Sequence, residues 1–295
     1  MDECVRRGHN AFIDADWPAL PDLATMSTAA ALELPGGPVL AYEDDGSGPA
    51  VLFSHGLFMS RRMFDPQVAA LRERYRCITW DERSHGDTAW RGDYDFYDSA
   101  RDAIALLDHL GIEQAVFCGM SQGGILSLRA ALIAPERVRA IVMIDSQAGV
   151  TKGSTGGPIG TTAEAWTEHG PRPVDADWLA NLILGPGVDP APWREYWTRL
   201  RPYQAQDAVR TLLARDDVTD RLGEIEVPVL VIHGTADEST TIERSRAVAD
   251  GVPDCRGLVL IEGAPHASNL SHPGEVNAAI LEFLQNLGPT MKGTP

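Results

Sequence analysis

A serine between glycines stands at the centre of CGMSQGG, residues 118–124. Glycines two positions before and after Ser121 permit a sharp, strained turn, because side chains at those places would collide. A turn of this kind exposes the serine hydroxyl as a nucleophile. The hydroxyl reacts poorly at neutral pH, so it needs a general base, usually a histidine that a carboxylate orients. The glycines alone also fit an ordinary turn. Whether Ser121 is a nucleophile therefore depends on the presence of a base and an acid, and on the elements that flank the serine.

The most suitable base among the histidines is His266. It lies in the loop GAPHASN, which follows the apolar run RGLVLIEG. If that run is a strand of a parallel sheet, His266 emerges at the edge where Ser121 also emerges. His272, which stands just before Pro273, is the main rival, although helix capping also explains it.

Two aspartates are candidates for the acid. Asp237 follows the apolar run VPVLVIHG, and Asp145 ends the apolar run after the segment that contains Ser121. Both placements suit a triad acid. We favour Asp237 because it gives the chain order Ser, Asp, His.

Hydrolysis at a serine also needs two donors for the oxyanion of the tetrahedral intermediate. The backbone N–H of Gln122, directly after the serine, has the right place for one. The second is expected from the segment HGLF, where we predict Leu57, with Phe58 as its neighbour. The side chain of Gln122 is expected to face the pocket as a polar group.

The elements around these residues alternate between helix-like and strand-like segments. Strand-like RCITWDE, QAVFCG and RAIVMID each follow a segment with the apolar spacing of a helix. The strand candidates are compact apolar runs without polar alternation, which is typical of strands covered on both faces by helices. A doubly wound α/β fold with a mostly parallel sheet is therefore predicted, and Ser121 falls at a strand-to-helix junction.

The alternation divides the chain into parts. Residues 27–146 and 225–290 carry the core pattern, and residues 147–224 interrupt it with a Gly/Thr-rich link and helix-like stretches. We predict that this insertion folds as a helical cap over one end of the sheet. Residues 1–26 form an N-terminal extension without a clear hydrophobic periodicity, and we assign it no role.

Aromatic residues of the insertion either form its core or line a pocket. We select Trp166 and Trp178, together with Phe58, as candidate substrate contacts. The tryptophans of the insertion are Trp166, Trp178, Trp193 and Trp197.

Composition excludes several classes of partner. The chain has 42 acidic and 25 basic residues, a net charge of -17, which disfavours nucleic acid and anionic membrane surfaces. No secretory signal and no apolar run long enough to span a bilayer are found, so a cytoplasmic location is predicted. The cysteines are scattered, and metal-ligand and nucleotide-binding motifs are absent, so neither a metal nor a cofactor is expected. A small molecule is the expected partner; the oligomeric state is not indicated.

Five motifs, taken in chain order, resemble those of the α/β-hydrolase superfamily, in particular its capped esterases and lactonases. They are HGLF, DERSHGDT, GMSQGG, HGTADES and GAPHASNLSHP. Two longer stretches, FDPQVAALRERYRCITWDERSHG and ALLDHLGIEQAVFCGMSQGG, are similar to the 3-oxoadipate enol-lactonase and haloperoxidase-like branch. The resemblance implies the α/β-hydrolase fold, a triad of Ser121, His266 and Asp237, no cofactor, and hydrolysis through an acyl-enzyme. Two residues depart from the pattern: Ser84 replaces the usual Gly, and Gln122 replaces Met or Leu.

The expected function is therefore cleavage of a carboxylic ester or lactone of a small, largely apolar molecule. Carbon-carbon bond hydrolysis or cofactor-free perhydrolysis would use the same triad, and a non-catalytic ligand receptor would keep the fold without turnover. An enol-lactone substrate would need a cation for its carboxylate. Arg61 and Arg62 are candidates, although a solvated surface pair is the favoured interpretation of both.

Overall fold

The sheet is the centre of the fold. The computed structural model describes residues 29–150, 165 and 172–288, so the predicted extension 1–26 and Trp166 lie outside the described residues. An 8-stranded sheet has the order β1-β2-β4-β3-β5-β6-β7-β8, in which β2 pairs antiparallel with β1 and β4 and all other neighbours are parallel. The strands are β1 Ala30–Glu33, β2 Val39–Gly46, β3 Ala50–Ser54, β4 Arg76–Trp80, β5 Ala115–Met120, β6 Val138–Ile144, β7 Val229–Gly234 and β8 Cys255–Ile261.

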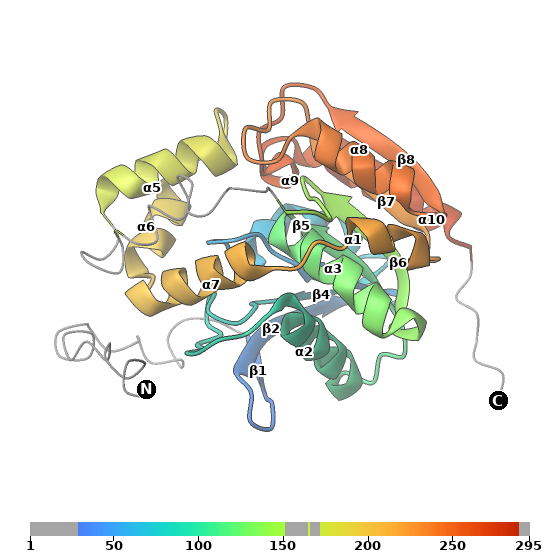
Figure 1. The fold of residues 1–295 in the computed structure, drawn as a ribbon, viewed down its shortest axis with the longest axis horizontal. Coiled ribbons are helices and arrows are strands. Elements are labelled where there is room, and N and C mark those ends of the chain that lie inside the picture. The colour runs from blue at the N-terminus through green and yellow to red at the C-terminus, as the bar shows by residue number, and fades with distance from the viewer. Residues whose placement is uncertain (1–28, 151–164, 166–171, 289–295) are drawn as a thin grey trace, which may run out of the picture.

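Helices cover both faces of this sheet, as Figure 1 shows. On one face pack α1 (Asp65–Leu71) and α10 (Pro273–Asn286), and on the other α2 (Phe96–His109), α3 (Gln122–Ile133) and α8 (Ile242–Gly251). This mostly parallel, two-sided arrangement confirms the predicted α/β class.

The period of two along each strand explains the two cores. In β3, Val51 and Phe53 belong to the cluster that includes α10, whereas Leu52 belongs to the cluster that includes α2 and α3. All five residues of β3 are buried. Strands buried on both faces need apolar side chains at every position, which is why these runs show no polar alternation.

Helices α5 (Pro173–Leu179), α6 (Ala191–Arg199) and α7 (Pro202–Ala214) lie in the chain between β6 and β7. We call α5 to α7 the inserted helices. Figure 1 shows them grouped on one side of the sheet, in yellow to orange. A π-helical turn, η4 (Ala180–Leu184), follows α5 directly.

The remaining elements are short. They are η2 Arg61–Phe64, η3 Pro135–Arg137, η5 Thr219–Glu224 and α9 Ser268–Ser271. None of the helices in the described part of the chain is both long and apolar enough to span a bilayer. The cytoplasmic location stays a prediction.

Candidate active site

Ser121 occupies the turn between β5 and α3 in a strained conformation. Its φ of 50° and ψ of -111° lie in a region of backbone conformation that residues other than glycine rarely adopt. The Ser121 N–H donates to the carbonyl of Ile144 at 2.8 Å, which ties the turn to the end of β6. The serine is half-buried.

The glycines around Ser121 are required by close backbone contacts. A Cβ on Gly119 would overlap the carbonyl group of Gly123, and a Cβ on Gly123 would overlap the carbonyl oxygen of Ser54. Gly124 packs equally tightly against Ser146. The turn is therefore sterically fixed by its own sequence, as expected for a nucleophile elbow.

The three predicted triad side chains lie together. The Nε2 atom of His266 is 3.1 Å from the Ser121 Oγ, and its Nδ1 atom is 2.8 Å from the Oδ2 of Asp237. A carboxylate only accepts, so Nδ1 carries the proton and Nε2 accepts from the serine hydroxyl. The other Asp237 oxygen accepts from the N–H groups of Ser239 and Thr240, at 2.7 and 2.9 Å. This geometry suits general-base activation of Ser121.

The electrostatics of His266 and Asp237 agree with this role. Burial opposes the charged form of His266, but the charge and hydrogen bond of Asp237 outweigh burial, so the pKa of His266 is raised. For Asp237, burial acts against ionisation, yet His266 and the two backbone donors leave its pKa below the usual range. The pair is therefore built to stabilise an imidazolium beside an ionised carboxylate.

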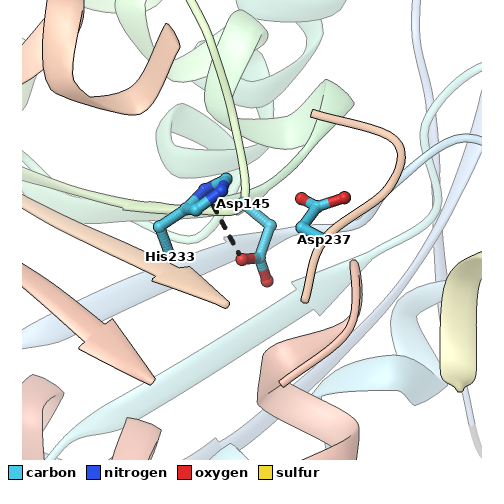
Figure 2. Close-up of side chains that lie close together, drawn as sticks. All are labelled: Asp145, His233 and Asp237. Atoms are coloured by element: carbon cyan, nitrogen blue, oxygen red, sulfur yellow. Dashed lines mark ion pairs between the residues drawn. The ribbon is translucent and has the colours of Figure 1, made fainter. Parts of the chain in front are cut away.

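Asp145, the alternative acid, lies beside Asp237 and has a different set of partners. Figure 2 shows it with His233 and Asp237. Its carboxylate accepts from the Gly234 N–H at 2.8 Å and from the N–H and hydroxyl of Ser268 at 3.0 and 2.6 Å. Burial, followed by the charge of Asp237, raises the pKa of Asp145 to about 7. Asp145 thus connects the ends of β6 and β7 to α9, and Asp237 is the carboxylate that contacts His266.

Ligand atoms of Asp145, His233 and Asp237 lie within 4.8 Å of one another, a spacing that could hold a metal ion. Both carboxylates, however, already accept hydrogen bonds from backbone and side-chain donors. The Ser245 hydroxyl donates to the Ser146 carbonyl at 2.9 Å, so His233 Nδ1, at 2.8 Å from that hydroxyl, must be the donor between them. We therefore assign Asp145 and His233 to structure, and Asp237 to its contact with His266.

The rival base, His272, is placed elsewhere. Its Nδ1 lies 2.9 Å from the hydroxyl of Ser271, at the start of α10. His266 is the histidine that faces Ser121.

The two predicted oxyanion donors come from separate segments of the chain. Gln122 opens α3, and the first N–H groups of a helix have no partner inside the helix. Within the described residues, the Leu57 N–H makes no backbone hydrogen bond. Both groups are thus available to a ligand atom, and their catalytic role stays a prediction.

Helix α6 of the inserted helices holds the loop that carries Leu57. Phe58 has a φ of 60°, and its carbonyl accepts from the Trp197 Nε1 at 2.7 Å. The Tyr196 hydroxyl donates to the Met59 carbonyl at 3.0 Å and accepts from the Gly86 N–H at 2.9 Å. The inserted helices therefore fix the shape of the oxyanion loop, residues 55–60.

The expectation for Arg61 needs correction. Arg61 is only 3% exposed, and its guanidinium pairs with Asp81, with Asp87 at 2.9 Å and with Glu43 at 3.2 Å. It is neither a solvated surface residue nor a cation available to a substrate carboxylate. The sequence missed these partners because they come from β2 and from the loop after β4. Arg62, in contrast, is largely exposed.

Neither tryptophan candidate is placed against the triad: Trp166 lies outside the described residues, and Trp178 lies on α5. Trp178 is half-buried on α5 and packs against the core cluster that includes Trp193 and Trp197. No contact with the triad follows for Trp178, so its role stays a prediction, as does that of Phe58.

One buried polar residue was missed in the sequence. Glu82 is completely buried, and its Oε2 accepts from the Nε2 of Gln122 at 3.1 Å. The Gln122 side chain, expected to face the pocket, is itself buried against this carboxyl group. The signal was present in DERSHG, where Glu82 follows an apolar strand at the carboxyl edge of the sheet.

A cavity of about 680 Å³ lies between β8 and α10. Leu230, Val259 and Phe283 are among its lining residues, and no triad or oxyanion residue is. It is separate from the site described above.

Comparison with known proteins agrees with this architecture. Residues 51–279 match the profile described as "Alpha/beta hydrolase family". The chain is 33% identical to 3-oxoadipate enol-lactonase 2 of Acinetobacter baylyi, over 79% of this chain and 87% of that protein. A thermophilic esterase from Thermogutta terrifontis superposes with a TM-score of 0.81 at 26% identity, covering 89% of this chain and 100% of that one. The enol-lactonase from Burkholderia xenovorans does so with a TM-score of 0.79 at 25% identity, covering 87% and 100%. The resemblance stated from the motifs is confirmed.

Proposed function

We propose that this chain, which belongs to the α/β-hydrolase family, cleaves a carboxylic ester or lactone through an acyl-enzyme at Ser121. The similar proteins named above include esterases and enol-lactonases, which act on ester bonds. The observation that carries the proposal is the continuous chain of contacts from the Ser121 Oγ through His266 to Asp237, at 3.1 and 2.8 Å. A serine in that setting has both a base and an orienting carboxylate.

The reaction uses these groups in two halves. His266 Nε2 takes the proton of Ser121 as Oγ attacks the substrate carbonyl, and the N–H groups of Leu57 and Gln122 receive the oxyanion. His266 then gives that proton to the leaving alkoxide, which leaves an ester on Ser121. A water molecule, deprotonated by His266, attacks this ester, and His266 returns the proton to Ser121 Oγ as the C–Oγ bond breaks and the acid is released. Asp237 stabilises the imidazolium in both halves.

The charges of the described residues favour a neutral substrate. A substrate with its own carboxylate would need a cation near the serine. Of the two candidates, Arg61 is neutralised by three carboxylates, and the exposed Arg62 pairs with Glu43 at 3.6 Å and with Asp65 at 3.5 Å. The net charge of -17 also disfavours anionic ligands at long range. We therefore propose a small, largely apolar and uncharged ester or lactone rather than an anionic enol-lactone.

The test is a turnover screen with chromogenic esters of increasing acyl length and a set of neutral lactones. Ser121→Ala is the blank, and Ser47→Ala, a change at an exposed turn, is the matched control. We expect Ser121→Ala to lower kcat at least about 10³-fold, while Ser47→Ala behaves as the parent protein. Equal turnover by Ser121→Ala and the parent protein would overturn the proposal. Tight ligand binding without turnover by the parent protein would favour the receptor alternative.

A further inference from the structure

Glu82 connects the two sides of the predicted oxyanion hole. Its backbone N–H donates to the Nε2 of His55 at 3.0 Å, and its Oε2 accepts from the Gln122 side chain at 3.1 Å. His55 begins the oxyanion loop, two residues before Leu57, and Gln122 supplies the other backbone donor. One buried residue therefore contacts both segments that must bind the oxyanion.

The surroundings of Glu82 contain more acceptors than donors. Among the described residues, the buried atoms Glu82 Oε1, Gln122 Oε1 and His85 Nε2 have no hydrogen-bond partner. His85 Nδ1 faces the Arg83 carbonyl at 2.8 Å and must donate to it, so His85 Nε2 carries a lone pair. All three orphan atoms are acceptors if Glu82 is ionised. Buried polar groups are rarely left unpaired, so the region lacks a donor.

A proton on Glu82 would supply that donor. Burial, which outweighs the hydrogen bond from Gln122, raises the pKa of Glu82 to about 8. Burial also keeps the neighbouring imidazoles neutral, because it lowers the pKa of His55 to about 4 and that of His85 to about 3. Asp102, which adds to the effect on Glu82, is itself bonded to Arg83. The titratable and charged groups that face Glu82 are His55, His85, Tyr94, Asp102 and Arg83.

We propose that Glu82 is held as a neutral carboxylic acid whose pair with the Gln122 amide positions the Gln122 backbone N–H for the oxyanion. The pair has two bonds: the amide Nε2–H donates to Glu82 Oε2, and the acid proton on Oε1 donates to the amide oxygen. Both orphan oxygens are then satisfied. Glu82 is a positioning residue, and the inference rests on the proposed function, because it concerns the oxyanion of that reaction.

Ionisation of Glu82 has two effects on the same step. It removes the proton that closes the pair with Gln122, and it places a fixed negative charge beside the site where the oxyanion forms. Both effects act on the transition state more than on the bound substrate, so kcat falls while KM changes little. The enzyme is therefore expected to lose turnover at alkaline pH, where a Ser-His-Asp triad alone would stay active.

The experiment compares kcat and KM between pH 6 and pH 10 for the parent protein, Glu82→Gln and Glu73→Gln. The last variant makes the same chemical change at an exposed glutamate. We expect kcat of the parent protein and of Glu73→Gln to fall about 30-fold between pH 7 and pH 9.5, and kcat of Glu82→Gln to fall less than about twofold. A parent protein without an alkaline fall, or a Glu82→Gln variant with the same fall, would overturn the inference.

A second variant tests whether Glu82 acts through Gln122. Gln122→Met removes the amide, so its kcat should be lower than that of the parent protein at pH 7, and adding Glu82→Gln should change its pH profile little. If Glu82→Gln alters the profile equally in both backgrounds, the pairing with Gln122 is wrong. Should Glu82→Gln fail to fold, a kcat of Gln122→Met equal to that of the parent protein would still refute the inference.

Infrared spectroscopy separates this inference from the proposed function, since it needs no turnover. We expect the spectrum of the parent protein minus that of Glu82→Gln to contain a carboxylic-acid C=O band at pH 7 that disappears at pH 10. Asp145, whose pKa is raised to about 7, is present in both proteins and cancels in this difference, and Glu73→Gln should give the band of the parent protein. A band that Glu82→Gln leaves intact contradicts the neutral acid. Retained esterase activity in Ser121→Ala would instead refute the proposed function. The infrared band would still show whether Glu82 is protonated, because it does not depend on turnover.

Discussion

At the scale of single residues, three carboxyl groups near Ser121 differ in what donates to them. Asp237 accepts from His266 and two backbone N–H groups, and its pKa is lowered although it is buried. Asp145 also accepts three hydrogen bonds, but none comes from a histidine, and burial and the charge of Asp237 raise its pKa. Glu82 accepts one hydrogen bond, from Gln122, and burial raises its pKa. Environment rather than residue type thus gives each carboxyl group its role.

The contact between Asp237 and His266 predicts a pH profile. Activity requires neutral His266, so kcat/KM rises with pH through a pKa above the ordinary value of 6.5. Asp237→Asn removes the charge that raises this pKa, so the acid limb should move to lower pH and kcat should fall about 10⁴-fold. Asp250→Asn, at an exposed site, is the control. An acid limb that stays in place in Asp237→Asn would show that Asp237 does not act on His266.

The sequence was sufficient to predict which residues meet at Ser121 because each candidate lies in the turn or loop that follows an apolar strand. Ser121, Asp237 and His266 are brought together as soon as the strands lie parallel. Chain order alone favoured Asp237 over Asp145 in the sequence, since both follow a strand, and the hydrogen bonds then place Asp237 against His266 and Asp145 against Gly234. The sequence could not identify the partners of Arg61 or Gln122, which depend on side-chain packing between separate loops.

At the scale of elements, the inserted helices do more than cover the sheet. Trp197 and Tyr196 on α6 hydrogen-bond to the carbonyls of Phe58 and Met59. Those carbonyls flank the strained backbone of the oxyanion loop, where Phe58 has a positive φ. A loop in such a conformation persists only when its surroundings hold it, so α6 is part of the support for the Leu57 N–H.

This support gives a prediction for Trp197→Phe. The change keeps an aromatic ring in the core and removes the bond to the Phe58 carbonyl, so kcat should fall about tenfold, with a smaller change in KM. Trp193→Phe, at a buried position of the same helix without such a bond, is the matched variant. A loss of kcat that is equal in both variants would attribute the effect to packing of α6 rather than to the oxyanion loop.

Element-level prediction from the sequence was accurate where periodicity was strong. The core strands from β3 onward coincide with the apolar runs, and α5 to α7 fall inside the predicted insertion 147–224. That residues 147–224 form a separate cap with these bounds stays a prediction. No apolar pattern indicates that α6 bonds to the oxyanion loop, because hydrogen bonds between a side chain and a distant carbonyl leave no trace in periodicity.

At the scale of the whole molecule, the charge balance sets how the fold responds to pH. A net charge of -17 means that each further ionisation adds to self-repulsion. Glu82, with its pKa raised to about 8, stays protonated in the folded chain over a range in which it ionises in the unfolded chain. The folded state then binds more protons, so this group makes stability fall as pH rises from about 4.5 to about 8.

The consequence is measurable as a difference between variants. The free energy of unfolding of Glu82→Gln minus that of the parent protein should increase by up to about 1.4 kcal/mol for each pH unit between pH 5 and pH 8, then level off. Urea unfolding at several pH values measures this difference, with Glu73→Gln as the control. A difference that is constant across this range would mean that Glu82 is ionised in the folded protein.

The central claim is that Ser121 becomes acylated during turnover. It is tested most directly by rapid quenching with a slowly deacylating ester, followed by intact-mass and peptide-mass measurement. We expect one added acyl group on the peptide that contains Ser121, formed as a burst and absent from Ser121→Ala. Steady turnover with no acyl group on Ser121, or an acyl group on another residue, would contradict it.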